Sequence, residues 1–462
     1  MPALARIFIT GFGLVTPLGL GAWQTFAALL AGRAISDRAA GLPADIAGID
    51  LARAIGCVAA AQHAADDPAI ELAERAAAEA GVGCRVSGVG SEQQQAVSAV
   101  HPIPELPTAS HDPIPALNPK PETRNPKPAP RPLPTFLGTS KGAFRTFDEA
   151  AAFFARHGAS AMATPASRSR CEVVALGAGE YMARQLEKRL NIHVMHHAVA
   201  ACASSLVALH RARLALLHRQ VEGDRALVLT ADAALTPSLI HAYRRLGVLA
   251  PLTTADYACR PLDRRRQGFV LAEAGAAVLL QRVEAGAGSD VIASLPRDAV
   301  ELIDTGEACD AFDLIRPNPQ MPAVGHLAES LLTGRDIDLI HPHAPGTMDH
   351  DPAELSVYHQ HAAHMTAKPA SGCRPKPAAP PTLNCYAHKG ALGHTLGASG
   401  LVSLVIACLC ARAQRCPPMP WLREPIEHAG IRGATASNPI RTQAIFAAGF
   451  GGHAAGAVIQ NS

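Results

Sequence analysis

Apolar and polar residues alternate along this chain in short blocks that predict strands and helices in turn. Runs rich in β-branched and aromatic residues predict strands, whereas apolar residues spaced three or four apart predict helices. We expect strands over 6–10, 226–230, 268–280 (broken at 273–275), 336–341, 444–448 and 456–459, and helices over 23–31, 173–190, 204–217 and 395–410. Strands that alternate with helices favour an α/β fold with buried strands, mostly of the parallel type.

One segment departs from this pattern. Residues 91–135 hold a dense run of prolines that includes two Asn-Pro-Lys-Pro units, which begin at Asn118 and Asn125. Proline cannot donate a backbone hydrogen bond to a sheet, and it favours an extended, solvated chain. We therefore predict that residues 91–135 form a disordered insertion outside the core.

The bulk composition is that of a globular protein with a large core. The chain has 462 residues, of which 48% are hydrophobic and 17% charged, so we expect two halves with cores or one large α/β unit. The net charge is +2 and the chain has no long basic run, which gives no support to binding of nucleic acid.

Cysteine use and the apolar stretches bear on the compartment. The 11 cysteines include no Cys-x-x-Cys pair, so we expect reduced thiols and a cytoplasmic protein, not a disulfide framework. Glycines and a proline interrupt the apolar stretch 7–30. Since no stretch reaches the roughly 20 apolar residues that span a bilayer, we expect no membrane insertion.

Cys202 is the first candidate for chemistry. It lies among small residues, between Ala201 and Ala203, directly before the predicted helix 204–217. The thiolate is the form that attacks thioesters, and the free N–H groups at the start of a helix favour that anion. Its small neighbours leave room for an acyl chain. Cys202 is thus a candidate nucleophile, although a buried structural residue fits the same local pattern.

His343 is the second candidate, because it directly follows a predicted strand. A histidine at the end of a buried strand faces a cleft, where a neutral imidazole can donate one hydrogen bond. Two acids follow it, Asp351 and Glu354. We expect both to be structural, with Asp351 capping the next helix. The neighbouring His341 and His350 are expected to lie on the surface.

Two glycine-rich segments complete the set of candidates. In residues 389–400 the glycines let the backbone approach a ligand closely. There His394 is a candidate donor to a developing oxyanion, and Lys389 is a candidate to fix charge and orientation around it. In the turn 449–452 the N–H groups are candidates for an oxyanion hole, and the ring of Phe450 for a pocket gate.

In this order, these segments resemble the β-ketoacyl-acyl-carrier-protein synthases of the elongating type and the related polyketide ketosynthase domains. Further segments that belong to the resemblance are 7–13, 16–19, 138–140, 202–209, 260–263 and 268–270. The resemblance implies an α/β fold of the thiolase-like, five-layer αβαβα kind, built from two similar βαβαβαββ halves, and a homodimer. We place the halves at residues 1–285, with the cysteine, and 286–462, with the two histidines.

The resemblance also implies the roles of the candidate residues. Cys202 would accept an acyl chain from a carrier-protein or coenzyme A thioester. His343 and His394 would then promote decarboxylation of a malonyl thioester and stabilise its enolate, with Lys389 supporting the pair. Backbone N–H groups of Cys202 and Phe450 would form the oxyanion hole.

The expected product is a 3-oxoacyl thioester of fatty-acid or polyketide synthesis. Its substrates arrive on the phosphopantetheine of an acyl carrier protein or on coenzyme A, so the resemblance implies the carrier protein as partner and no resident cofactor or metal. Thr347 is expected to contact the pantetheine arm.

The sequence departs from the family pattern at several positions. Pro345 replaces one of the two threonines that normally contact the pantetheine arm. The glycine-rich end continues with His453 and Ala454 in place of the usual Thr-Asn, and the acid that usually follows the second histidine is Ser403. These changes leave the cysteine and both histidines in place but alter the expected carrier contacts and pocket lining.

Two other functions are compatible with these residues. A Cys202-dependent acyltransferase would form the same acyl-enzyme but pass the acyl group to an alcohol or amine without decarboxylation. A non-catalytic subunit similar to a chain-length factor would shape a pocket on an active partner. Such subunits typically lose the thiol, so Cys202 argues against this function, while Pro345 and the altered glycine-rich end argue for it.

Overall fold

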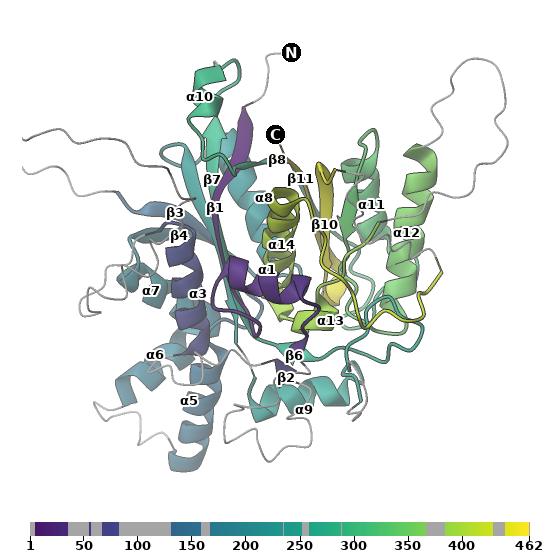
Figure 1. Cartoon of the computed structure of the whole chain (residues 1–462). Helices are drawn as coiled ribbons and strands as arrows, with labels where there is room; N and C mark the ends of the chain where they lie inside the picture. The colour runs from purple at the N-terminus through teal and green to yellow at the C-terminus, as the bar shows by residue number, and fades with distance from the viewer. Residues whose placement is uncertain are drawn as a thin grey trace, which may run out of the picture.

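The computed structural model describes residues 5–35, 55–56, 67–82, 131–158, 167–233, 235–251, 258–287, 289–365, 384–427 and 439–461. Its main sheet contains β1 (Arg6–Val15), β3 (Leu133–Gly138), β4 (Ile192–Ala198), β5 (Arg225–Asp232), β7 (Ala274–Val283), β8 (Val300–Cys309), β9 (Leu339–His341), β10 (Thr442–Ala448) and β11 (His453–Asn461). These nine strands lie in the order β4-β3-β5-β7-β1-β8-β11-β10-β9 (Figure 1). Two short strands, β2 (Ile55–Gly56) and β6 (Leu271–Ala272), pair separately.

The strand order shows that the sheet consists of two halves of the same topology. In β4-β3-β5-β7-β1 the strands occur as the third, second, fourth, fifth and first along the chain. In the other half, β9-β10-β11-β8, a parallel bridge from Ile340 to Cys385 stands where a further strand would flank β9. With that bridge as its third strand, the second half has the same order and the same sense of pairing. The position of the boundary at residue 285 stays a prediction.

The helices complete a five-layer arrangement. Between the two half-sheets lie α8 (Ser204–Leu217) and α14 (Ser399–Ala413), which pack on strands of both (Figure 1). On the outer faces, α3 (Pro68–Glu79) and α7 (Ala178–Arg189) cover the first half, and α11 (Pro322–Leu332) and α12 (His350–Met365) cover the second. The expected thiolase-like αβαβα fold is therefore confirmed.

The remaining helices are short or peripheral. They are α1 (Ala22–Leu30), α5 (Phe144–His157), α6 (Arg168–Leu176), α9 (Pro237–Arg245), α10 (Ser289–Ala293), α13 (Lys389–Leu392), and the 3₁₀ turns η6 (Leu396–Ala398) and η7 (Phe450–Gly452). The helix predicted over 173–190 is two helices, because Gly177 at φ 78° separates α6 from α7. The predicted strands and the other helices are present, with ends shifted by a few residues.

The expectation of mostly parallel strands was wrong. Of the eight neighbouring pairs in the described main sheet, three are parallel: β3 with β4, β3 with β5, and β9 with β10. Each half ends on strands that return antiparallel, such as β10 and β11, which are joined by a short turn. Buried strands read as continuous apolar runs in either sense, so hydrophobicity alone does not distinguish the two.

Two glycines that follow the predicted strand 6–10, Gly11 and Gly13, lie inside β1. A Cβ at Gly13 would lie 2.0 Å from the carbonyl oxygen of Ala76, and one at Gly11 would lie 2.4 Å from that of Ala80. These glycines therefore let the α3 segment pack directly on the strand, and they do not form a turn.

The proline-rich segment ends inside the core. Residues 91–130 lie outside the described residues, but 133–135 belong to β3, where Thr135 is fully buried. Extending the predicted insertion to residue 135 was therefore wrong. Pro134 is tolerated because it pairs only with β4, while pairing with β5 begins at Thr135.

One helix in the described part of the chain is long and apolar enough to cross a membrane by length and composition. It is the continuous stretch Leu396–Ala413, formed by η6 and α14, and 89% of it is buried inside the protein. The stretch is buried between the two half-sheets. Because the core helix of a soluble protein is equally long and apolar, this helix is weak evidence for a membrane span.

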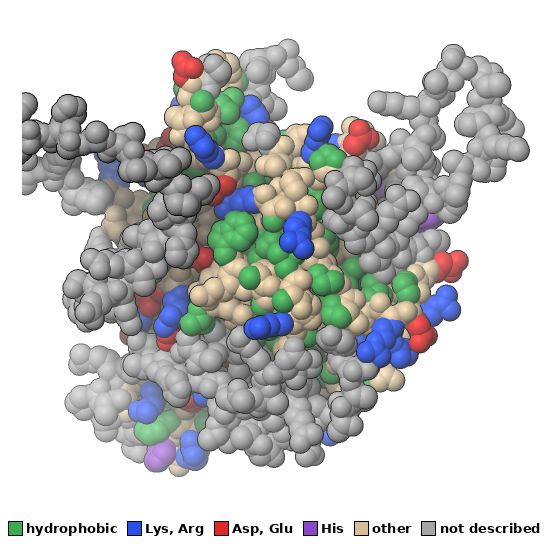
Figure 2. All heavy atoms as spheres, in the orientation of Figure 1, with side chains coloured by type: hydrophobic (Ala, Val, Ile, Leu, Met, Phe, Trp, Pro, Cys, Tyr) green, Lys and Arg blue, Asp and Glu red, His purple; other side chains and the backbone are tan. Residues whose placement is uncertain are grey.

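The face in front of the viewer carries α1. Figure 2 shows hydrophobic side chains gathered over the middle of this face, with Lys and Arg side chains around them. On α1, Trp23 is 53% exposed and packs edge-to-face on the buried Phe26, at a centroid distance of 6.1 Å. This part of the surface is continuous with the core beneath α1.

Candidate active site

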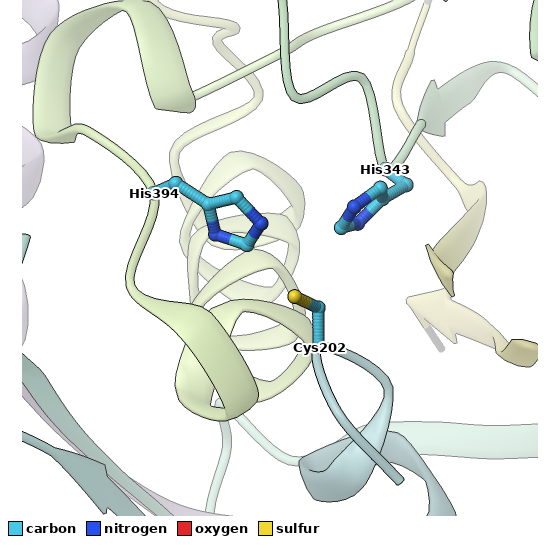
Figure 3. Close-up of side chains that lie close together, drawn as sticks. All are labelled: Cys202, His343 and His394. Atoms are coloured by element: carbon cyan, nitrogen blue, oxygen red, sulfur yellow. The ribbon is translucent and has the colours of Figure 1, made fainter. Parts of the chain in front are cut away.

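The three residues expected to carry the chemistry come together where the two halves meet. Cys202 precedes α8, His343 follows β9, and His394 lies between α13 and η6. The sulfur and one ring nitrogen from each histidine all lie within 4.8 Å of one another. Both imidazole rings are directed toward the thiol (Figure 3).

A tight turn presents Cys202. Ala201 has a left-handed φ of 46°, which is uncommon for a residue with a side chain. The Ser204 hydroxyl accepts a hydrogen bond from the Ala200 N–H at 2.9 Å and donates to the Ala201 carbonyl at 2.6 Å. The strain of the turn is thus held by buried hydrogen bonds, as at other functional sites.

The Cys202 thiol is protonated in the resting protein. Burial raises its pKa to about 12, although the positive charges of Lys389 and Lys141 oppose this effect. We had expected the start of α8 to favour the thiolate. Because the side chain is only 8% exposed, desolvation dominates over the charges of the two lysines.

The hydrogen bonding of His394 defines the role of its ring. Nδ1 accepts a hydrogen bond from the Leu396 N–H at 3.1 Å, so the neutral ring carries its proton on Nε2. Burial, followed by the charge of Lys389, holds the pKa of His394 well below its usual range. The ring is therefore neutral and offers an N–H donor to the site.

Glu354 holds the backbone around His343. Its carboxylate accepts hydrogen bonds from the N–H groups of His343 at 2.7 Å and Ala344 at 2.8 Å. Ala344 has a left-handed φ of 32°, so this contact stabilises a strained residue next to the histidine. Burial, followed by the charge of Lys389, keeps the pKa of His343 well below its usual range, and the ring is neutral.

Asp351 also binds backbone, but it does not cap a helix. Its carboxylate accepts from the N–H groups of Gly346 at 3.0 Å and Leu262 at 2.9 Å. The capping expectation was wrong because α12 begins at His350, which places Asp351 inside the first turn. Like Glu354, it shapes the loop that carries His343.

Lys389 lies fully inside the protein. It is 1% exposed, and its ammonium donates a hydrogen bond to the carbonyl oxygen of His343. Burial lowers the pKa of Lys389 to about 8, although the charge of Glu354 acts in the opposite direction. Lys389 therefore links the segment that carries His394 to the backbone of His343.

His341 and His350 are buried, so the expectation that they lie on the surface was wrong. Nε2 of His341 shares a hydrogen bond of 2.9 Å with Gln443, and burial lowers the pKa of this histidine to about 4. His350 is 8% exposed and packs against His343, with ring centroids 5.0 Å apart. Both are buried because β9 and the start of α12 are covered by other elements.

Phe450 and its neighbours lie against the nucleophile. A Cβ at Gly449 would lie 2.7 Å from the backbone nitrogen of Cys202, so only glycine allows this approach. The Phe450 ring stacks on Tyr243 with centroids 6.4 Å apart. The turn 449–452 is therefore positioned beside the thiol, where we expected an oxyanion hole and a gate.

A cavity of about 310 Å³ leads to the three residues. Thr347 and Pro345 line it beyond the histidines, and Phe450 lines it beside the thiol. The Thr347 carbonyl accepts a hydrogen bond of 2.8 Å from the buried Arg266. All residues that we assigned to chemistry or substrate contact line this cavity, except Lys389, which lies behind His343.

By distance alone, Cys202, His343 and His394 could hold a metal ion. A metal bound at Nε2 of His394 requires a lone pair there and the proton on Nδ1. That arrangement conflicts with the hydrogen bond that Nδ1 accepts from the Leu396 N–H. The donor set of this site therefore fits a hydrogen-bonding histidine better than a metal ligand.

Sequence reasoning missed two supporting groups. Asp232 is fully buried and accepts hydrogen bonds from Thr139 at 2.7 Å and from the Ser140 N–H at 3.2 Å. Ser140 in turn accepts from the Gly397 N–H, close to His394. An acid just after the predicted strand 226–230 was the available signal.

The second missed group is His388. It is 1% exposed, and its Nδ1 lies 3.2 Å from the hydroxyl of Ser403, the position where the family usually carries an acid. A serine–histidine contact thus stands beside Lys389 in place of the expected carboxylate. No sequence pattern pointed to His388, because its partner lies fifteen residues away on α14.

A thiol and two neutral imidazoles at the junction of a duplicated α/β fold define a thiolase-like site. Family models agree with this description: "Beta-ketoacyl synthase, N-terminal domain" matches residues 135–285, and "Beta-ketoacyl synthase, C-terminal domain" matches residues 315–422. The chain belongs to the beta-ketoacyl synthase family. The matched regions contain Cys202, His343, Lys389 and His394 but not Phe450.

Two curated relatives illustrate what the chain is similar to. The 3-oxoacyl-[acyl-carrier-protein] synthase 2 of Mycobacterium tuberculosis is 28% identical over 267 residues, which cover 55% of this chain and 58% of the relative. The 6-methylsalicylic acid synthase of Penicillium terrestre is 29% identical over 282 residues, 56% of this chain and 14% of that protein. The chain thus matches less than two thirds of the length of either relative.

Solved structures share the fold over the whole chain. A type II polyketide ketosynthase in complex with its acyl-carrier protein has a TM-score of 0.70 and 17% identity, with 100% of both chains covered. A beta-ketoacyl synthase from Burkholderia phymatum has a TM-score of 0.65 and 19% identity, with 99% of this chain and 100% of that chain covered. The thiolase-like fold of these ketosynthases is the fold of this chain.

Proposed function

We propose that the chain catalyses the decarboxylative condensation of an acyl thioester with malonyl-acyl-carrier protein, which yields a 3-oxoacyl-acyl-carrier protein. The observation that carries this proposal is the grouping of the Cys202 thiol with two neutral imidazoles in one cavity. The family and the names of the relatives support a role in fatty-acid or polyketide synthesis.

In the first half-reaction, the Cys202 sulfur attacks the carbonyl carbon of the acyl thioester. Overall, the proton of the Cys202 thiol passes to the sulfur of the carrier, which departs as a thiol when the tetrahedral intermediate collapses. The negative oxygen of that intermediate accepts hydrogen bonds from the backbone N–H groups of Cys202 and Phe450. Each such donor contributes about 3–4 kcal/mol to the stability of the transition state.

In the second half-reaction, the malonyl thioester oxygen accepts hydrogen bonds from the Nε2–H of His394 and from His343. The bond to the carboxylate breaks, carbon dioxide leaves, and the electron pair forms an enolate. The enolate carbon attacks the acyl carbonyl, and the Cys202 thiolate leaves. Neutral imidazoles suit this role because they donate a hydrogen bond without transferring the proton.

The proposed partner is an acyl carrier protein, and the proposed compartment is the cytoplasm. Arg316 lines the mouth of the cavity, and Arg244 and Arg245 end α9, whose neighbours Leu246 and Gly247 also line it. Positive groups there suit the phosphate of a phosphopantetheine arm. The reaction as proposed needs no resident cofactor, because the arm arrives with the substrate.

The experiment that tests the proposal is an intact-mass measurement. The protein is mixed with an acyl thioester of acyl carrier protein, and malonyl-acyl-carrier protein is then added. We expect one acyl adduct that disappears as a 3-oxoacyl product forms. An adduct that malonyl thioester leaves in place would support an acyltransferase, and absence of any adduct would support a non-catalytic subunit.

We also propose that two copies of the chain pair through β4. This strand lies at the edge of the described sheet, with Met195 46% exposed and Val199 63% exposed just beyond it. Exposed edge strands pair readily, and a two-fold axis places the same strand opposite itself.

The pairing predicts a solution mass of twice the 48.1 kDa of the chain. Met195→Lys should shift the mass to that of one chain in light-scattering measurements, because two charges would face each other across the axis. Leu314→Lys is the matched control, since Leu314 is 81% exposed on a different segment. A monomer mass for the unsubstituted protein would contradict the proposal.

A further inference from the structure

Tyr243 is a polar residue of the cavity wall that takes no part in the proposed mechanism. It lies in the last turn of α9 and lines the cavity together with Cys202 and Phe450. Leu239, Ile240 and Tyr243 form the buried face of α9, because residues three and four apart lie on one side of a helix. This spacing turns the tyrosine ring inward, and the residue is only 7% exposed.

Aromatic contacts hold the ring of Tyr243 in place. It stacks on Phe450 with centroids 6.4 Å apart and an angle of 26°, and it meets Phe269 edge to face at 6.0 Å. Phe269 in turn meets the ring of His394 edge to face at 4.8 Å. Phe450 supplies a proposed donor to the oxyanion, and His394 a proposed donor to the enolate. Tyr243 thus belongs to a row of packed rings that runs from one proposed donor to the other.

The hydroxyl of Tyr243 has no hydrogen-bond partner in the part of the chain that the structure describes. A buried tyrosine hydroxyl usually has one, as Tyr358 does with Glu354 at 2.6 Å. Burial raises the pKa of Tyr243, and the negative charges of a Cys202 thiolate and of Asp232 raise it further. The hydroxyl therefore keeps its proton and lies unpaired in the cavity wall, near the sulfur that carries the acyl group.

An unpaired hydroxyl at this place distinguishes between acyl chains. A saturated chain on Cys202 would take water away from the Tyr243 hydroxyl and offer no hydrogen bond in return, which costs free energy. An oxygen atom on the chain would replace the lost water. A site that hydrogen-bonds a substrate oxygen rejects the analogue without that oxygen far more strongly than an apolar pocket rejects an added group.

We propose that the Tyr243 hydroxyl is a specificity-determining group that binds an oxygen atom on the third carbon of the acyl chain. The protein then accepts 3-oxoacyl and 3-hydroxyacyl thioesters in preference to saturated ones. The oxygen on the first carbon is already bound in the proposed oxyanion hole, and the third carbon is the next to carry oxygen in a chain built by condensation with malonyl units. The hydroxyl donates to a 3-oxo group and can donate to or accept from a 3-hydroxy group.

The substrate must therefore come from a reaction of a particular class. A preceding condensation leaves a 3-oxo group, and that group is kept or is reduced only to the alcohol before the chain reaches Cys202. This preference deepens the proposed condensation activity and rests on it, because it concerns the acyl group that Cys202 accepts in the first half-reaction.

The test compares loading of Cys202 by the acetoacetyl and butyryl thioesters of pantetheine, which differ only in the 3-oxo group. Intact mass gives the initial rate of each adduct. Tyr243→Phe removes the hydroxyl oxygen but keeps the ring, and we expect it to lower the ratio of acetoacetyl to butyryl loading by about tenfold. The intrinsic reactivities of the two thioesters cancel, because the same pair is used with both proteins. Tyr181→Phe, on α7 at the outer face, is the control and should keep the ratio of the unsubstituted protein.

A second pair of thioesters tests the unsubstituted protein directly. It should load 3-hydroxybutyryl faster than butyryl, and equal rates would overturn the inference even if Tyr243→Phe is insoluble. An unchanged acetoacetyl to butyryl ratio in Tyr243→Phe would also overturn it. Equal slowing of both acyl groups would do the same, because it would assign the hydroxyl to the carbonyl that they share.

The same measurements separate this preference from the proposed function. If none of these thioesters forms an adduct, the proposed function fails, and the inference fails with it. If the adducts form with the expected ratios but malonyl thioester does not discharge them, the condensation is overturned and the acyl preference is kept.

Discussion

Cys202→Ala is expected to abolish acyl loading and to reduce formation of the 3-oxoacyl product by about 10⁴-fold or more, because no covalent intermediate can form. Intact mass with an acyl thioester checks the loading, and product analysis after addition of malonyl thioester checks the condensation. The substitution removes only one sulfur atom from a buried position, so the fold should persist.

Cys259 is the matched control for this substitution. It is buried to a similar extent, its Sγ lies 3.9 Å from the Pro345 carbonyl oxygen, and burial raises its pKa to about 12 as well. Cys259→Ala should still form the acyl adduct, since its thiol is not grouped with the histidine pair. An adduct on the Cys202→Ala protein at the usual rate would assign the nucleophile to another residue.

The raised pKa of Cys202 gives the direction of the pH dependence. With a pKa of about 12, the thiolate is a minor species near neutral pH, and its fraction grows about tenfold for each pH unit below that value. Acyl loading should therefore become faster as the pH rises from 7 to 9, measured as the initial rate of the mass change. A loading rate that falls over this range would show that the thiol ionises by another route.

The sequence allowed the chemical groups to be predicted better than their surroundings. Cys202, His343 and His394 each follow or precede an element with a clear hydrophobic pattern, and such positions fall at the ends of strands and helices. Their meeting point also follows from the resemblance, since the family order of these residues is specific. Where the local pattern was strong, as in α8, the predicted bounds match the structure.

The surroundings could not be predicted because they depend on contacts between distant segments. His350 and His341 look like surface residues in the sequence, yet both are buried. His350 lies beside Glu354, and His341 shares a hydrogen bond with Gln443. Gly11 lies in β1 because α3 packs on it, and Thr135 is buried because β5 pairs with it. Periodicity along the chain carries no information about partners that far apart.

The same limit applies to the ionisation state of the site. The position of Cys202 before α8 suggested a thiolate, since a helix N-terminus favours an anion. Whether this effect wins depends on how much water reaches the sulfur, which is a property of the assembled halves. Here Cys202 is buried beside the two histidines and the turn 449–452, and desolvation outweighs the opposing charges of Lys389 and Lys141.

His343→Ala and His394→Ala are expected to separate the two half-reactions. Each variant should still load the acyl group onto Cys202, because neither ring belongs to the proposed oxyanion hole. Each should lower decarboxylation of malonyl thioester by about 10²–10³-fold, the usual effect of removing one donor to a developing negative charge. Intact mass measures the loading, and carbon dioxide release measures the decarboxylation.

The two variants are also expected to differ in thermal stability. His394→Ala also removes the acceptor of the Leu396 N–H, which would then lie buried without a partner, so this variant should lose more thermal stability. The backbone of His343 is held by Glu354 and Lys389 independently of its ring, so His343→Ala should unfold at nearly the usual temperature. His218→Ala, at the exposed end of α8, is the control. Normal decarboxylation by either active-site variant would remove that histidine from the mechanism, whereas loss of acyl loading would place it in the first half-reaction.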